Sequence, residues 1–310
     1  MLNLQNKVSS GCKVPGTELL VLVAVLVSLC CCASLVRAEQ QYAVTGMLLK
    51  VNPSRQAIVV SCKEVPGYMQ AMVMSFAVGD PRALETLKPG DAIDFTLVIK
   101  KDSSYAENIR VVPFESLELD PTETRRLKLL EQMIAHDSPA MAPLAGGQAV
   151  PDFTLIDQDR NYLKLSQLAG KVVAVSFIYT RCPRPEYCFR VSNNFGRLQK
   201  QFKERMGRDL VLLSIVIDPA HDQPDALTHY ARIWKAQAGN WYFLTGPLPV
   251  VQRVCRRFDM SFYPDEALLL HSFRTAVIDR QGKMAALLDG NEYTFQQLSD
   301  LVESTLDQHN

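Results

Sequence analysis

Short apolar runs alternate with turn-forming residues in the segment that begins near residue 40. Five runs are rich in β-branched and aromatic residues, which is typical of strands: YAVTGMLLKV, AIVVSC, QAMVMSFAV, DAIDFTLVIK and NIRVVP. Asn-Pro-Ser, Pro-Gly and Pro-Gly-Asp sequences lie between them and favour turns. Five short strands within about 70 residues predict a small closed or half-closed β-barrel of the OB type over residues 40–113.

The pattern changes to helical spacing in residues 120–137. Leu127, Leu130, Met133 and Ile134 recur at intervals of three, three and one residues, and Pro121 suits a first helical turn. The following SPAMAPLAGGQA is rich in small residues, proline and glycine, as linkers are. We therefore assign residues 114–148 to a helix and a linker.

Strand patterns and helix patterns alternate from residue 149 to residue 310. The strand candidates are FTLI, VVAVSFIY, LVLLSIVI, TAVID and KMAALLD. The helix candidates are VSNNFGRLQKQFKERM, PDALTHYARIWKAQ, LPVVQRVCRRF and TFQQLSDLVESTLD. This alternation predicts one three-layer α/β domain. The predicted fold class is thus two domains, a small all-β barrel followed by an α/β domain.

Residues 1–38 have the pattern of a targeting segment. Lys7 and Lys13 precede the apolar stretch LLVLVAVLVSLCCCASLV at residues 19–36. Its 18 residues are just enough to span a bilayer if they are not removed. The sequence predicts an exported, periplasmic protein. A cleaved signal peptide and an inner-membrane anchor both remain open.

The charge balance excludes one class of partner. The 33 basic side chains are matched by 33 acidic ones, and no basic stripe is interleaved with aromatic residues. A protein that binds nucleic acid needs such a positive surface to neutralise phosphates. We therefore expect no nucleic-acid partner.

Export places the cysteines that follow the leader in an oxidising compartment, which changes how they are interpreted. Four of the eight lie in the leader, which leaves Cys62, Cys182, Cys188 and Cys255. Four scattered cysteines are too few for a disulfide-stapled scaffold. Cys255 has helical spacing to Val251 and Val254 and is expected to be a buried structural thiol. Thiols retained in an oxidising compartment point to metal binding or redox exchange.

Cys182 and Cys188 lie in the loop YTRCPRPEYC, directly after the apolar run KVVAVSFIYT. This spacing puts Cys182 at the end of a central strand and Cys188 at the start of the next helix. A helix N-terminus carries partial positive charge and lowers the pKa of a nearby thiol. Such a pair can be a structural disulfide, a redox pair or a soft-metal site. Two sulfurs leave a metal under-coordinated, and His271, just before a predicted strand, is a candidate third ligand.

The C-terminal domain resembles the Sco/SenC family of copper chaperones, which have a thioredoxin-like fold. Four separated segments carry the resemblance, from PDFTLIDQDRNYLKLSQLAGKVVAVSFIYTRCP through LLSIVIDPAHDQPDALTHYA and WYFLTG to HSFRTAVIDRQGKMAALLDGNEYTFQQL. In that family two loop cysteines and a distant histidine bind copper. The resemblance therefore implies Cys182, Cys188 and His271 as ligands of copper(I), with copper(II) as an alternative at this site.

One departure from the family separates this loop from its relatives. The usual loop reads C-x-x-x-C-P, whereas this chain has five residues between the cysteines and Phe189 after the second. The two added residues enlarge the loop and remove a proline. We expect the metal affinity, the redox potential or the acceptor to differ from the family norm.

A second group of soft side chains lies in the barrel segment CKEVPGYMQAMVMSF. It contains Cys62, Met69, Met72 and Met74. Spacing alone favours core packing, because Met72 and Met74 share one face of a strand and methionine commonly fills cores. Residues 42–113, however, resemble the CusF-type periplasmic copper-binding barrel. That resemblance implies Met72 and Met74 as thioether ligands of copper(I), with Cys62 in place of the usual histidine and Met69 in place of an aromatic lid.

The sequence thus predicts an exported copper metallochaperone. The resemblance implies delivery of copper to, or reduction of the thiols of, the copper-site subunit of cytochrome c oxidase, with another cuproprotein acceptor or a thioredoxin-like reductant as further partners. The alternative is a periplasmic thiol–disulfide oxidoreductase that uses Cys182 and Cys188 and needs no metal. A peroxiredoxin-type peroxidase ranks last, because its attacking cysteine follows a threonine by three residues and Thr180 precedes Cys182 by two.

Overall fold

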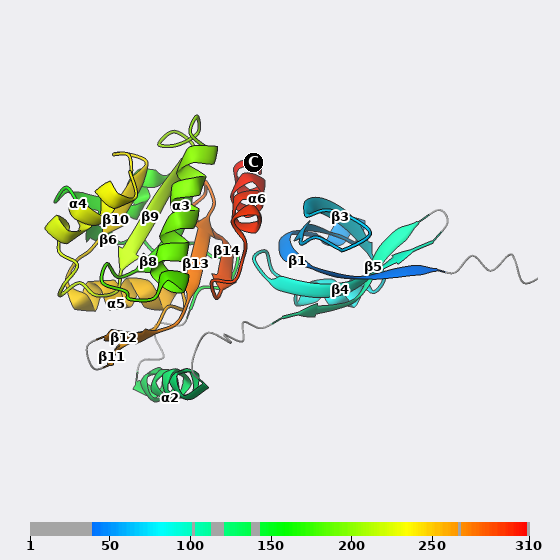
Figure 1. The fold of residues 1–310 in the computed structure, drawn as a ribbon, viewed down its shortest axis with the longest axis horizontal. Helices are drawn as coiled ribbons and strands as arrows, with labels where there is room; N and C mark the ends of the chain where they lie inside the picture. The colour runs from blue at the N-terminus through cyan, green and yellow to red at the C-terminus, as the bar shows by residue number, and fades with distance from the viewer. Residues whose placement is uncertain (1–38, 101–102, 113–120, 138–142, 266–267, 309–310) are drawn as a thin grey trace, which may run out of the picture. The chain divides into compact units, whose positions relative to one another are not determined.

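The computed structural model describes residues 39–100, 103–112, 121–137, 143–265 and 268–308 (Figure 1). The predicted leader, residues 1–38, lies outside this range. No helix within the described ranges is long and apolar enough to cross a membrane. The barrel, the helix that follows it and the α/β domain are described one by one.

The N-terminal part is a closed barrel of five strands, as predicted. The strands are β1 (Gln40–Asn52), β2 (Ala57–Cys62), β3 (Met72–Val78), β4 (Ala92–Ile99) and β5 (Ser104–Val111), in the order β1-β2-β3-β5-β4. The pairs β1–β2, β2–β3 and β4–β5 are antiparallel, and β3 and β5 pair in parallel.

Alternate residues of these strands fill the barrel interior. Leu48, Ile58 and Val60 are fully buried, and the rings of Phe76 and Phe95 meet edge to face with 5.0 Å between centroids. Strands β1 and β2 approach closely at Gly46, where an added Cβ would lie 2.5 Å from a Val60 methyl carbon. Only glycine fits at this contact.

Residues 121–137 form the predicted helix, α2 (Pro121–Asp137), with the proline at its first position. The predicted linker lies partly outside the described residues, since residues 138–142 are not among them.

The C-terminal part is built on a five-stranded mixed sheet. Its strands are β8 (Val172–Ile178), β9 (Leu210–Val216), β10 (Trp241–Leu244), β13 (Arg274–Ile278) and β14 (Met284–Asp289), in the order β10-β9-β8-β13-β14. Strands β8, β9 and β10 are parallel, and β13 is antiparallel to both of its neighbours. The connecting helices are α3 (Arg190–Gln201), α4 (Pro224–Ile233), α5 (Leu248–Arg257) and α6 (Phe295–Leu306).

Helices cover both faces of this sheet, which confirms the predicted three layers (Figure 1). On one face the indole nitrogen of Trp241 donates to the Ser214 hydroxyl, and the Trp241 ring contacts Phe195 of α3. Phe177 points to the opposite face, where its ring lies 5.6 Å from that of Phe258 at the end of α5. The neighbouring Ser176 hydroxyl forms a hydrogen bond with the Ser214 hydroxyl on the first face, because successive side chains of a strand point to opposite faces of the sheet.

Two small hairpins lie outside the main sheet. The pair β6 (Thr154–Ile156) and β7 (Tyr162–Lys164) is antiparallel, as is the pair β11 (Phe262–Asp265) and β12 (Leu268–His271). The sequence pattern predicts only the first strand of the four. The second hairpin ends at His271, one of the copper ligands that the sequence predicts.

Candidate metal centres

The dithiol loop is held at the carboxyl end of the central strand. Strand β8 ends at Ile178, and a turn over Pro185–Phe189 leads directly into α3. Cys182 is partly exposed, whereas Cys188 is 5% exposed, and both are free thiols. The predicted placement of the two cysteines between a strand and a helix is confirmed.

Two aspartates anchor the residues that precede Cys182. The Asp222 carboxylate accepts hydrogen bonds from the backbone N–H of Thr180, at 3.1 Å, and from its hydroxyl, at 2.5 Å. Asp218 pairs with the Arg181 guanidinium at 2.7 Å and also contacts the His221 ring. The sequence analysis missed Asp222. The second aspartate of DPAHD was the available signal.

The two thiols differ in protonation. A hydrogen bond from Cys188 is the main cause that lowers the pKa of Cys182 to about 6, against the opposing effect of burial. Backbone groups of Arg184 and Cys188 and the Tyr179 hydroxyl add further hydrogen bonds. That same bond to Cys182, together with burial, raises the pKa of Cys188 well above its ordinary value. At neutral pH the loop therefore holds one thiolate and one thiol that share a proton.

Tyr179 supports this arrangement as a neutral donor. Burial, followed by the negative charge of Cys182, raises the pKa of its phenol. The hydroxyl thus keeps its proton while it donates to the Cys182 sulfur.

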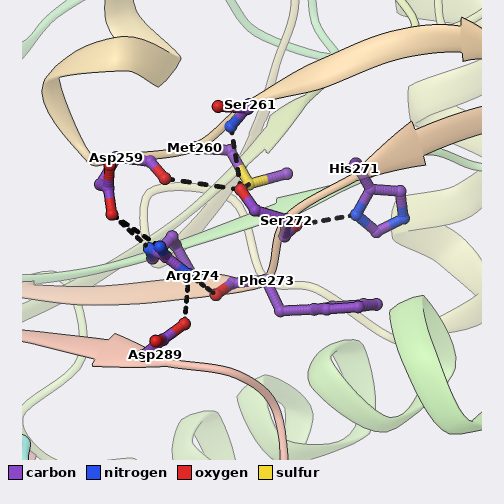
Figure 2. A network of polar contacts seen from close by, with 8 residues as sticks. All are labelled: Asp259, Met260, Ser261, His271, Ser272, Phe273, Arg274 and Asp289. Atoms are coloured by element: carbon purple, nitrogen blue, oxygen red, sulfur yellow. Dashed lines mark hydrogen bonds and ion pairs between the residues drawn. The ribbon is translucent and has the colours of Figure 1, made fainter. Parts of the chain in front are cut away.

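His271 is prepared to offer one ring nitrogen to a metal. Its Nδ1 lies 2.8 Å from the backbone oxygen of Ser272 (Figure 2). Because a carbonyl oxygen only accepts, Nδ1 carries the proton and the lone pair is on Nε2. Burial lowers the pKa of the imidazole, so the ring stays neutral at pH 7. A neutral histidine fixed by a backbone carbonyl is the usual form of a metal ligand.

The residues that follow His271 are fixed by polar contacts (Figure 2). Arg274 pairs with Asp259 at 2.6 Å and with Asp289. The Ser272 hydroxyl accepts from the backbone N–H of Ser261 at 2.9 Å. These contacts tie the end of the β11–β12 hairpin to the end of α5 and to strand β14.

Aromatic rings surround the His271 imidazole. The centroids of Phe273, Tyr179 and Tyr187 lie 4.8, 5.7 and 6.4 Å from that of the imidazole. Within the described ranges, no three His, Cys, Asp or Glu side chains are grouped closely enough to hold a metal ion. The structure therefore brings the two thiols together but does not join His271 to them. The three-ligand set stays a prediction.

The soft side chains of the barrel gather on neighbouring strands. Cys62 of β2 lies opposite Met72 of β3, and Met74 lies two residues further along the same strand face. Met72 is 48% exposed, while Met74 and Met69 are partly buried against the barrel core. Burial raises the pKa of Cys62 to about 12, so a metal that binds its sulfur must displace a proton. Thioethers and a thiol in this pattern suit copper(I).

An aromatic pair near Met69 was missed by the sequence interpretation. The rings of Tyr42 and Tyr68 stack with 4.1 Å between centroids and 18° between planes. Tyr68 directly precedes Met69, but its partner comes from β1, far away in sequence. The sequence therefore shows Tyr68 beside Met69 but gives no sign that Tyr42 stacks on it.

A cavity of about 710 Å³ lies beside the anchor of the dithiol loop. Asp218, Thr245 and Phe262 are among its lining residues, whereas Cys182, Cys188 and His271 are not. The thiols are therefore not enclosed in this cavity. The partly exposed Cys182 suits exchange with a protein partner better than turnover of an enclosed small substrate.

These features define a class of protein: an α/β domain that presents a dithiol at a strand end, preceded by a barrel that carries methionine and cysteine side chains on neighbouring strands. The SCO1/SenC family matches residues 142–306, and the family of the copper binding periplasmic protein CusF matches residues 41–110. The first match covers more than half of the 310 residues. The chain belongs to the SCO1/SenC family, with a thioredoxin-like fold and an N-terminal CusF-like domain.

Individual relatives agree with this assignment. A SCO1 protein homolog of Bacillus subtilis is 32% identical over 109 residues, which are 33% of this chain and 55% of that protein. A putative copper-binding protein of Stutzerimonas stutzeri is 26% identical over 164 residues, 49% of this chain and 78% of the relative. The aligned stretch thus spans little more than half of the Bacillus protein.

Among solved structures, a SCO1/SenC family lipoprotein from Bacillus anthracis superposes with a TM-score of 0.47 and 24% identity, over 52% of this chain and 96% of that one. Yeast Sco1 with copper bound gives a TM-score of 0.46 and 24% identity, over 54% and 91%.

Proposed function

We propose that this protein is an exported copper metallochaperone. The observation that carries the proposal is the partly exposed, low-pKa Cys182 hydrogen-bonded to the buried Cys188. A thiolate paired with a second thiol suits copper(I), which accepts few, soft ligands. Cys182, Cys188 and His271 would hold copper in the thioredoxin-like domain, and Cys62, Met69, Met72 and Met74 would hold it in the barrel.

Copper is the cargo, and its transfer proceeds by ligand exchange. The barrel acquires copper(I), and the dithiol loop holds it or passes it on. Cys182 is the more exposed sulfur, so an incoming acceptor thiolate reaches the copper from the side of Cys182. The acceptor is the copper-site subunit of cytochrome c oxidase or another cuproprotein. The copper-bound Sco1 structure and the name of the Stutzerimonas relative support copper as the cargo.

The location outside the cytoplasm is part of this proposal. The charged and apolar pattern of residues 1–38 supports export. The CusF match, a periplasmic protein, and the lipoprotein from Bacillus anthracis agree with it.

One observation favours a second function, thiol–disulfide exchange. The pKa of Cys182 is about 6 and that of Cys188 is far higher, which is the division expected of an attacking and a resolving cysteine. The Cys182 thiolate would attack a partner disulfide and release one partner thiolate. Cys188 would then displace the second, with loss of its proton, and leave a Cys182–Cys188 disulfide and a reduced partner dithiol.

Replacement of His271 separates the two functions. In the chaperone, H271A is expected to weaken copper(II) retention by the thioredoxin-like domain while disulfide exchange stays near the wild-type rate. C182S, the matched control, should abolish both. Equal copper(II) affinity in H271A and wild type would contradict the three-ligand site. An inactive dithiol in exchange assays would remove the second function.

A further inference from the structure

The lengthened dithiol loop contributes a buried aromatic side chain, Tyr187. It directly precedes Cys188 and is only 4% exposed. Its ring meets Phe273 edge-on at 4.6 Å and stands 6.4 Å from the His271 ring. A loop residue thus takes part in the aromatic surroundings of the histidine.

Polar contacts hold this part of the loop in place. The Arg184 guanidinium donates to the Tyr187 hydroxyl at 3.1 Å and lies 5.3 Å from the ring centroid. The Asn291 side chain donates to the backbone oxygen of Glu186 at 2.9 Å. The Asn291 side-chain oxygen is buried without a partner, so Asn291 serves the loop through its nitrogen. The two extra residues therefore belong to an ordered turn.

Tyr187 is linked to both halves of the proposed copper site. Through the backbone it is attached to Cys188, and through its ring it contacts the His271–Phe273 segment. Because no three-ligand group exists among the described residues, the imidazole and the two sulfurs need a rearrangement to meet. The turn that carries Tyr187 is joined to Cys188 through the chain and contacts His271 through the ring, so a movement of this turn changes their separation.

We propose that Tyr187 is a specificity-determining gate that decides whether His271 joins Cys182 and Cys188 around copper. The inference rests on the proposed copper function of this loop. With Tyr187 in its buried place, copper meets two sulfurs, a set that copper(I) accepts. When Tyr187 moves out, the imidazole nitrogen becomes the third ligand, which copper(II) needs more because it prefers nitrogen donors and higher coordination.

The size of the effect follows from the population of the open state. A minor conformer populated at about 10% reduces the apparent affinity of a ligand that requires it about tenfold. Removal of the Tyr187 ring is expected to raise the copper(II) affinity of the loop by about that factor or more. The copper(I) affinity should change little, since the two sulfurs are available in both states.

The test compares Y187A with Y187F, which keeps the ring and removes the hydroxyl that accepts from Arg184. The first readout needs no copper: diethyl pyrocarbonate is added to the metal-free chain, residues 39–310, and the modification rate of each histidine is followed by mass spectrometry. His271 should react about tenfold faster in Y187A and near the wild-type rate in Y187F. The exposed His221 serves as the internal control.

The second readout is copper(II) affinity, measured by competition with a chelator in each variant with and without H271A. The proposal expects Y187A to bind copper(II) about tenfold more tightly, and H271A to remove this gain. A folded Y187A with an unchanged His271 reaction rate would overturn the gate. A gain in copper(II) affinity that persists when Y187A is combined with H271A would also overturn the gate.

If Y187A does not fold, Y187L decides, because it removes the aromatic ring and leaves a smaller apolar side chain in its place. A faster His271 reaction in Y187L supports the gate, and an unchanged rate overturns it. Failure of the copper function itself looks different: the loop would bind no copper in any variant, while the His271 reaction rates would still report the gate.

Discussion

At the scale of single residues, the environment shifts the pKa of cysteine thiols in opposite directions. Cys182 receives several hydrogen bonds and has a pKa of about 6, whereas the fully buried Cys255 has its pKa raised by desolvation. Cys255 is therefore inert, as its helical spacing predicts. The sequence places Cys182 and Cys188 in one loop, but the difference between their pKa values depends on their mutual hydrogen bond and on contacts with Tyr179 and the loop backbone.

Cys182 should react with iodoacetamide at a pH where ordinary thiols do not. A lowered pKa favours the thiolate, so the rate is expected to rise as the pH passes about 6 and to level off near neutrality. Mass spectrometry should find Cys182 labelled and Cys188 and Cys255 unlabelled. C188A removes the main hydrogen-bond donor, and its rate profile should shift to higher pH. A profile that stays in place would contradict the shared proton.

Asp222 should stabilise the residues that lead into the loop. D222A removes the acceptor of two Thr180 hydrogen bonds and is expected to lower the free energy of unfolding by about 1–3 kcal/mol. T180V, which loses only the hydroxyl bond, should cost less. Urea denaturation of the soluble chain measures both. A D222A variant as stable as wild type would show that these bonds add nothing.

At the scale of elements, regular patterns were predictable and short pieces were not. The five barrel strands and the helices α3 to α6 follow from period-two and helical spacing. Strand β10, with four residues, and the β11–β12 hairpin have too few positions to show a period. The Asp222–Thr180 contact and the aromatic rings around His271 join distant segments, so no local pattern could reveal them.

Copper(I) binding and core packing should depend on different residues of strand β3. Met72 is 48% exposed, so M72L is expected to change barrel stability little while copper(I) binding by the barrel is lost. Phe76, which is 3% exposed, belongs to the core, and F76A should cost about 3–5 kcal/mol. Thermal unfolding and copper(I) competition assays measure the two effects. A large loss of stability in M72L would favour packing as the role of Met72.

At the scale of the whole chain, two folds with soft ligands occur in one polypeptide. The barrel provides thioethers and a protonated thiol, and the thioredoxin-like domain provides a thiolate beside a thiol. A protein that only exchanged disulfides would need the second domain alone. The presence of both is the reason to place copper handling first.

The most direct test is the copper(I) stoichiometry of residues 39–310, loaded without oxygen, for wild type, C182S and M72L. The account predicts two copper ions per wild-type chain and the loss of one in each variant. A dithiol domain that binds no copper, but exchanges disulfides readily, would contradict the chaperone and leave the oxidoreductase.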